Sequence, residues 1–170
     1  MTGLPQRTEA APQYFTYIDR VSGEDIRAVL DEQLVTLGAR LRSISEEKSL
    51  YRYAPEKWSI RQVWNHVNDT ERAFLFRAMW FARGFTAPLP GYDQEIAAAG
   101  AGADNFSWAA HVEEFQAIRR DTLAFFRNLP DEAWMRRGIA SDNPFTVRAL
   151  AYIIAGHVSH HWSVIEDKYV

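Results

Sequence analysis

The sequence predicts an all-α protein built as a four-helix bundle. Four segments of about 20 residues place apolar side chains at steps of three and four, which gathers them on one face of a helix. No segment shows the alternation of apolar and polar residues that is typical of a half-buried strand. The 170 residues are the size of one domain, which we divide into a tail or strap over residues 1–22 and the bundle over residues 23–170.

The first two helices are each preceded by a capping signal. The first is expected over residues 23–43, with Ser22 as its N-cap and Asp25 three residues later, close to a capping box. The second starts at Ser59, where Gln62 completes the capping-box pattern, and glycines and prolines from Gly84 onward end it. The predicted apolar faces are Ile26, Leu30, Leu34, Leu37, Leu41 and Ile44 in the first helix, and Ile60, Val63, Trp64, Val67, Phe74 and Leu75 in the second.

The last two helices follow the same logic. The third starts at Ser107 and stops before Asn128 and Pro130, and the fourth runs from Thr146 to about Asp167. Their predicted apolar faces are Trp108, Val112, Phe115, Ile118, Leu123 and Phe126, and then Val147, Leu150, Ala151, Ile154, Val158 and Ile165.

Two connections join these helices. The segment 86–106 holds three glycines and two prolines and is long for a link between packed helices, so it allows a crossover. Residues 97–99 within it can form a short helical turn. The second connection covers residues 131–144.

Histidines carry the strongest chemical signal. His157 and His161 stand four residues apart, so on a helix both imidazoles can reach one ion at about 2.0–2.1 Å. A helical wheel puts both on or beside the apolar face and turns His160 toward solvent or a subunit contact. The alternative is a polar cluster near a helix C-terminus, where protonated histidines suit the helix dipole.

A metal site needs a third ligand, and the chain has no cysteine. His66, at the edge of the buried face of the second helix, is the candidate, although an exposed histidine fits that edge equally well. His111 lies in the first turn of the third helix, and we expect it to be too near that end to join the site.

Glu71 falls inside the apolar arc of the second helix, where an unpaired carboxylate is costly. We consider a metal ligand, an acceptor for an imidazole N–H, or a general base, and name Glu71 as the catalytic candidate. The alternative, which its position favours, is a Glu–Arg pair inside the bundle.

Composition excludes several classes of function. Without cysteine the chain forms no disulfide framework, iron–sulfur cluster or thiolate metal site. A net charge of −3 argues against nucleic acid as a partner, and no apolar run is long enough for a membrane helix. The start of the sequence has no basic segment followed by an apolar run, so we expect no signal peptide and a cytoplasmic protein.

Two motifs resemble a known family. Residues 58–67, WSIRQVWNHV, are similar to the W-S-I-x-x-[VI]-x-x-H-[LV] signature of the DinB-like superfamily, which includes the YfiT-like metal-dependent hydrolases. The pair His157 and His161 resembles the H-x-x-x-H element near the C-terminus of that family, and the resemblance covers about residue 24 to the end.

The resemblance implies a bundle with up-down-down-up order and a divalent metal, zinc or nickel, on His66, His157 and His161. It also implies a homodimer, and relatives that transfer low-molecular-weight thiols or isomerise a substrate with a thiol.

We therefore predict a metal-dependent small-molecule enzyme, either a hydrolase or a thiol S-transferase that uses a thiol cosubstrate. Three histidines leave an open coordination position, which is typical of a catalytic metal. The alternative function is a non-catalytic, stress-related binding or dimerisation bundle with a stabilising or vestigial metal.

Overall fold

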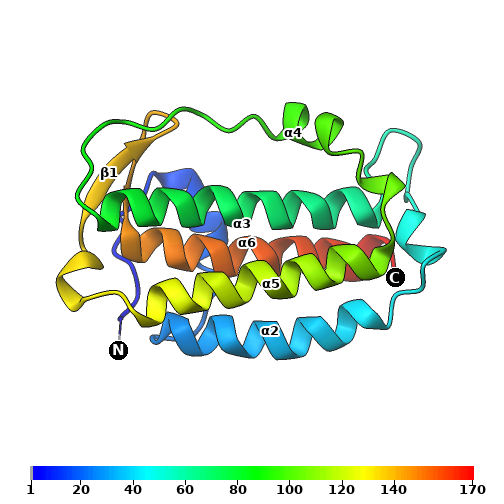
Figure 1. Cartoon of the computed structure of the whole chain (residues 1–170), viewed down its shortest axis with the longest axis horizontal. Coiled ribbons are helices and arrows are strands. Elements are labelled where there is room, and N and C mark those ends of the chain that lie inside the picture. The colour runs from blue at the N-terminus through cyan, green and yellow to red at the C-terminus, as the bar shows by residue number, and fades with distance from the viewer. Residues whose placement is uncertain (1) are drawn as a thin grey trace.

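The computed structural model describes residues 2–170 and contains the four expected long helices (Figure 1). They are α2 (Ile26–Arg42), α3 (Ile60–Ala82), α5 (Trp108–Arg127) and α6 (Val147–Lys168). In Figure 1, α2 and α6 run one way while α3 and α5 run the other, which is the up-down-down-up order that the sequence resemblance implied. Among residues 2–170, no helix has the combination of length and apolarity needed to cross a bilayer.

The parallel direction of α3 and α5 requires a crossover along the bundle. Residues 83–107 provide it, and Figure 1 shows this segment passing beside α3 with the short helix α4 (Gln94–Ala101) on it. The sequence predicted only a turn at 97–99. The helix is longer because the Asp93 side chain accepts hydrogen bonds from the backbone N–H groups of Glu95 and Ile96.

Side-chain caps set the starts of the long helices. The capping box of Ser59 and Gln62 is confirmed at the start of α3, and Ser107 and Thr146 cap α5 and α6. The predicted cap of the first helix was wrong: Asp25, not Ser22, accepts from the backbone N–H of Arg27. The helix therefore begins three residues later than expected, with Ile26 as its first buried residue.

The N-terminal strap (residues 2–22) is more regular than its sequence suggested. A 3-10 turn at Pro12–Tyr14 leads into α1 (Phe15–Ile18), whose Phe15 and Ile18 are buried in the core. The chain packs α1 against α6. Four residues are too few to show a helical period, so tertiary packing decides this element.

A β-hairpin precedes α6 and was not expected. Strands β1 (Arg137–Ala140) and β2 (Asn143–Thr146) pair antiparallel through a two-residue turn at Ser141 and Asp142, both with positive φ. Strands of four residues lie below the length at which alternation can be recognised. The hairpin fills the second connection and fixes the direction in which α6 departs.

Buried apolar residues form two clusters along the bundle axis. One contains α1, the hairpin and the start of α6, and includes Phe74, Leu30 and Leu123. The other contains the opposite half of the bundle, where Trp64 and Phe115 pack with Val158. Three histidines and a group of hydrogen-bonded polar side chains lie where the two clusters meet, so these side chains are held on both sides by close-packed core.

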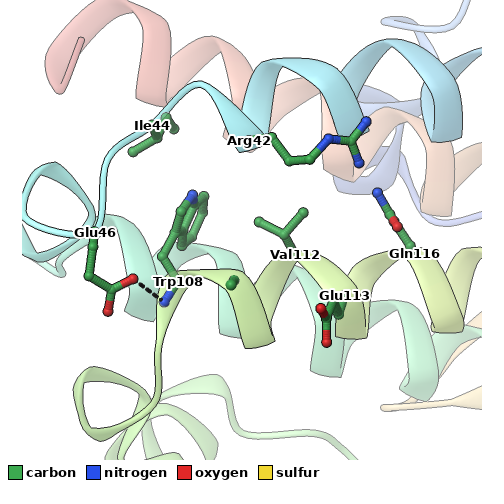
Figure 2. A pocket seen from close by; sticks show the side chains of 8 residues that line it. Arg42, Ile44, Glu46, Trp108, Val112, Glu113 and Gln116 are labelled. Atoms are coloured by element: carbon green, nitrogen blue, oxygen red, sulfur yellow. Dashed lines mark hydrogen bonds between the residues drawn. The ribbon is translucent and has the colours of Figure 1, made fainter.

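Glu46 joins the starts of α3 and α5 at one end of the bundle. Its carboxylate accepts from the backbone N–H of Trp108 at 2.8 Å (Figure 2). It also pairs with Arg61. Figure 2 also shows the neighbouring surface pocket of about 390 Å³ between α2 and α5, with Ile44, Trp108 and Val112 among its lining residues. The histidine cluster described below does not line this pocket.

Gly156 allows the strap to contact α6, and its substitution tests that contact. A Cβ at this position would lie 2.0 Å from the carbonyl oxygen of Tyr17, a backbone atom that cannot rotate away. We expect Gly156→Ala to destabilise the protein by about 1–3 kcal/mol, measured by chemical denaturation. Gly100→Ala is the matched control, because its Cβ meets open space on exposed α4 and should be neutral or stabilising. Equal stabilities for the two variants would contradict the assigned contact.

Candidate metal centre

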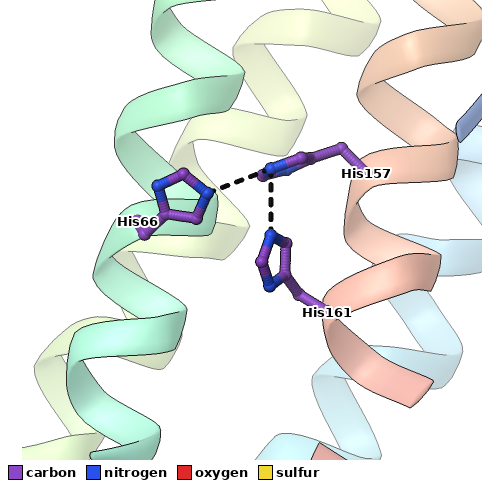
Figure 3. Close-up of side chains that lie close together, drawn as sticks. All are labelled: His66, His157 and His161. Atoms are coloured by element: carbon purple, nitrogen blue, oxygen red, sulfur yellow. Dashed lines mark hydrogen bonds between the residues drawn. The ribbon is translucent and has the colours of Figure 1, made fainter. Parts of the chain in front are cut away.

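His66 of α3 and His157 and His161 of α6 point toward one another (Figure 3). The Nε2 atom of His157 lies 3.1 Å from Nε2 of His66 and 3.1 Å from Nε2 of His161. All three ligand-capable nitrogens fall within 4.8 Å of one another. We call these three residues the histidine cluster. Residues 91 positions apart in the sequence meet here because α3 and α6 are antiparallel neighbours.

Burial keeps the three imidazoles neutral. Desolvation lowers the pKa of His66 from 6.5 to about 4. The pKa of His161 falls to about 3, first through burial and then through the neighbouring histidines. The same two causes hold the pKa of His157 well below its usual value. Neutral imidazole is the form that binds a metal ion, so all three side chains are ready to donate at neutral pH.

Neighbouring side chains orient the rings. The Thr70 hydroxyl, one turn after His66 on α3, lies 3.3 Å from His66 Nδ1, which leaves Nε2 facing the cluster. The Trp58 ring lies 5.4 Å from the His66 ring, and the Tyr17 ring meets His157 edge-on at 5.2 Å. Tyr17 belongs to the strap, so sequence analysis did not connect it with the site.

The two remaining histidines stay outside the cluster. His160 is half-buried and packs edge-on against Tyr17, with a pKa lowered by burial and by Arg20. His111 is buried, and its Nε2 lies 2.9 Å from the carbonyl oxygen of Ala103. The position of His160 agrees with the helical wheel, which turned it away from the apolar face, and His111 lies in the first turn of α5 as expected.

Glu71 lies in a buried ion pair. Arg119 of α5 binds both of its carboxylate oxygens, at 2.8 and 2.7 Å, and the Thr122 hydroxyl donates to one of them at 2.8 Å. Glu71 is 3% exposed and Arg119 is fully buried. This is the Glu–Arg pair that its position favoured, and the catalytic role of Glu71 stays a prediction.

A pocket of about 370 Å³ opens beside the histidine cluster. His161 lines it, and so do aromatic residues of the surrounding loops, Tyr53 and Trp58. Gln94 and Glu95 of α4 form part of its wall, so the crossover contributes to the site. Tyr169 completes this wall and is held by its hydroxyl, which donates to the Trp58 carbonyl at 2.8 Å.

The sequence model of one protein family, the DinB superfamily, matches residues 12–165 of this chain. The chain belongs to the DinB superfamily. The match begins at residue 12, so it includes much of the strap that the sequence resemblance left out. Among curated proteins, none matches the chain.

A solved structure supports the fold of this DinB-superfamily protein. It is YfiT from Bacillus subtilis, described as a probable metal-dependent hydrolase with an unusual four-helix bundle topology. The alignment has a TM-score of 0.72 at 17% sequence identity and covers 96% of this chain and 89% of YfiT. At this identity the likeness establishes the bundle topology, which confirms the predicted fold class.

The donor set of this DinB-superfamily protein fits a divalent metal ion. Nitrogen ligands about 2.0–2.1 Å from a tetrahedral ion lie about 3.3 Å from each other. Two of the three separations, both 3.1 Å, are close to this value, and all three nitrogens lie within 4.8 Å of one another. Since both contacts share one nitrogen, His157 Nε2, hydrogen bonding alone gives a poorer account of three converging neutral imidazoles than a shared cation does.

The lowered histidine pKa values predict acid sensitivity of the metal-free protein. Unfolded imidazoles titrate near 6.5, so between about pH 4 and 6.5 the unfolded chain binds more protons. The free energy of unfolding should therefore be highest above pH 6.5 and decrease as the pH falls from 6.5 toward 4. His66→Gln should flatten the slope by up to about 1.4 kcal/mol per pH unit, measured by urea denaturation at several pH values. Parallel slopes for the two proteins would contradict the buried neutral state of His66.

Proposed function

We propose that this protein is a metal-dependent small-molecule enzyme whose divalent ion is held by His66, His157 and His161. The observation that carries the proposal is the convergence of three neutral Nε2 atoms from two helices within 4.8 Å. Within residues 2–170, the histidine cluster is the one group of metal-ligating side chains with this spacing.

Three protein ligands leave a coordination position for a reactant, as in catalytic rather than structural sites. When bound, such an ion would lower the pKa of a water or thiol in that position and supply a nucleophile near neutral pH. Neighbouring side chains orient the histidines and shield them from water. Thr70 fixes the His66 ring, while Trp58 and Tyr17 cover the cluster with apolar surface.

The pocket beside His161 favours an enzyme over a purely structural bundle. Its volume of about 370 Å³ is within the range of small-molecule sites, and it borders a proposed ligand directly. A dimerisation module with a stabilising metal needs no such space next to that metal. The description of YfiT as a probable metal-dependent hydrolase supports hydrolysis as the first reaction to test.

Thiol transfer is the second reaction within the same proposal. The chain has no cysteine, so a sulfur nucleophile must come from a low-molecular-weight thiol cosubstrate. Zinc or nickel as the native ion, and a homodimeric state, belong to the proposal as further predictions. A role of Glu71 in proton transfer or in supporting the site is a further prediction, and its carboxylate accepts three hydrogen bonds from buried partners.

Metal content tests the ligand assignment. Wild-type protein purified without a nickel column should carry a stoichiometric divalent ion, measured by elemental analysis. His157→Ala should lose it, because His157 Nε2 is the nitrogen shared by both short contacts. His160→Ala is the matched control, since it removes from the same helix an imidazole that packs against the His161 ring but is not one of the three proposed ligands. Equal metal content in wild type and His157→Ala would refute the assignment.

An activity screen separates the chemical alternatives. The metal-loaded protein is tested with esters, amides and electrophiles, each with and without a low-molecular-weight thiol. Turnover without thiol indicates a hydrolase, and turnover that requires thiol indicates a transferase. Absence of turnover with metal bound would favour the stabilising-metal alternative.

A further inference from the structure

A connected set of polar side chains crosses the bundle interior next to the histidine cluster. We call it the polar layer, and it consists of Gln33, Glu71, Arg119, Thr122 and Ser159. Arg119 of α5 binds Glu71 of α3 through Nε and Nη2, and its Nη1 donates to Gln33 Oε1 of α2 at 2.7 Å. All four long helices contribute at least one member.

Gln33 carries the connection onward to α6. Its Nε2 donates to the Ala155 carbonyl at 2.9 Å and to the Ser159 hydroxyl at 3.0 Å. His157 lies between these two acceptors in the sequence. The amide of Gln33 therefore holds the turn of α6 that carries the central histidine of the cluster.

The other end of the polar layer reaches the helix of His66. Glu71 follows Thr70, whose hydroxyl contacts His66 Nδ1 at 3.3 Å. The connection thus starts on α3 beside one proposed ligand and ends on α6 beside another. It passes through α5 and α2, which contribute no histidine to the cluster.

Directional bonds give this layer a property that the surrounding core lacks. Apolar packing is non-directional, so the two hydrophobic clusters alone tolerate small axial shifts between helices. The guanidinium of Arg119 is fully buried and Glu71 is 3% exposed. Sliding α3 or α5 would leave a buried charge unpaired, which is strongly unfavourable, and sliding α6 would break both hydrogen bonds of the Gln33 amide. The polar layer therefore fixes the position of α6 relative to α3 along the bundle axis.

We infer that Gln33 and Arg119 are positioning residues of the metal site, acting from the two helices that hold no ligand. The inference rests on the proposed metal site. The polar layer fixes the axial register of α3 and α6, and this register brings the three Nε2 atoms together.

Gln33→Met tests the inference with little change in volume. It removes both hydrogen bonds to α6 and the acceptor of Arg119 Nη1, while the two bonds between Arg119 and Glu71 remain. We expect zinc affinity, measured by competition with a chromophoric chelator, to weaken about tenfold. The absorption bands of the Co²⁺-loaded protein should also change, because they report the ligand geometry. Ser159→Ala keeps the bond to the Ala155 carbonyl and should bind zinc nearly as wild type does.

Arg148→Met is the control for general destabilisation. Arg148 pairs with buried Glu9 near the start of α6, in contact with the strap, away from the histidine cluster. This variant should lower the melting temperature of the metal-free protein and leave zinc affinity and the Co²⁺ spectrum unchanged. Gln33→Glu is a second test variant if Gln33→Met does not fold, because it keeps the acceptor for Arg119 and loses the donors to α6.

The outcomes separate the two proposals. A wild-type protein that binds no zinc removes the proposed metal site itself and the inference with it. Zinc binding by wild type with unchanged affinity in the Gln33 variants overturns the inference alone. An equal loss of affinity in Arg148→Met overturns it too, because the effect is then general destabilisation.

Discussion

The ion pair between Glu71 and Arg119 imposes the strictest constraint on this bundle. A fully buried guanidinium is tolerated only with a paired, hydrogen-bonded carboxylate. Arg119 donates hydrogen bonds to both carboxylate oxygens of Glu71. The pair joins two parallel helices, α3 and α5, and through Gln33 it reaches the other two. Apolar clusters lie on either side of it, so one hydrophilic cross-section divides the core into two halves.

The same desolvation that demands a partner for Arg119 prepares the histidines. In water an imidazole is partly protonated near pH 6.5, but inside the bundle the neutral form is favoured. Three neutral rings whose Nε2 atoms face one another can together bind a cation. Burial therefore has two effects in this bundle. It requires Arg119 and Glu71 to stay paired, and it keeps the three histidines uncharged.

Much of this could be read from the sequence, because its signals are local. The long helices follow from apolar steps of three and four and from caps such as Ser59, and the histidine cluster follows from a four-residue spacing and a family motif. The hairpin and α1 could not be predicted, since strands and helices of four residues show no periodicity.

Contacts between residues distant in the sequence were the second feature that could not be predicted. The apolar wheel position of Glu71 indicated an arginine partner, but choosing Arg119 among many arginines requires knowing how α3 and α5 pack. Gln33 had no sequence signal at all, because a glutamine on a half-buried helix face is ordinary until its amide is seen between Arg119 and α6. Tyr17 was missed for the same reason, as it belongs to a strap that meets α6 only in three dimensions.

The placement of the histidines in the chain has a consequence for how the protein matures. His66 meets His157 across 91 positions, and α6 follows every other helix of the bundle. A nascent polypeptide leaving the ribosome therefore presents its first imidazole long before the other two emerge. At the proposed metal site, capture of an ion would have to await docking of α6, so metal binding would follow synthesis of the four long helices and would not nucleate folding.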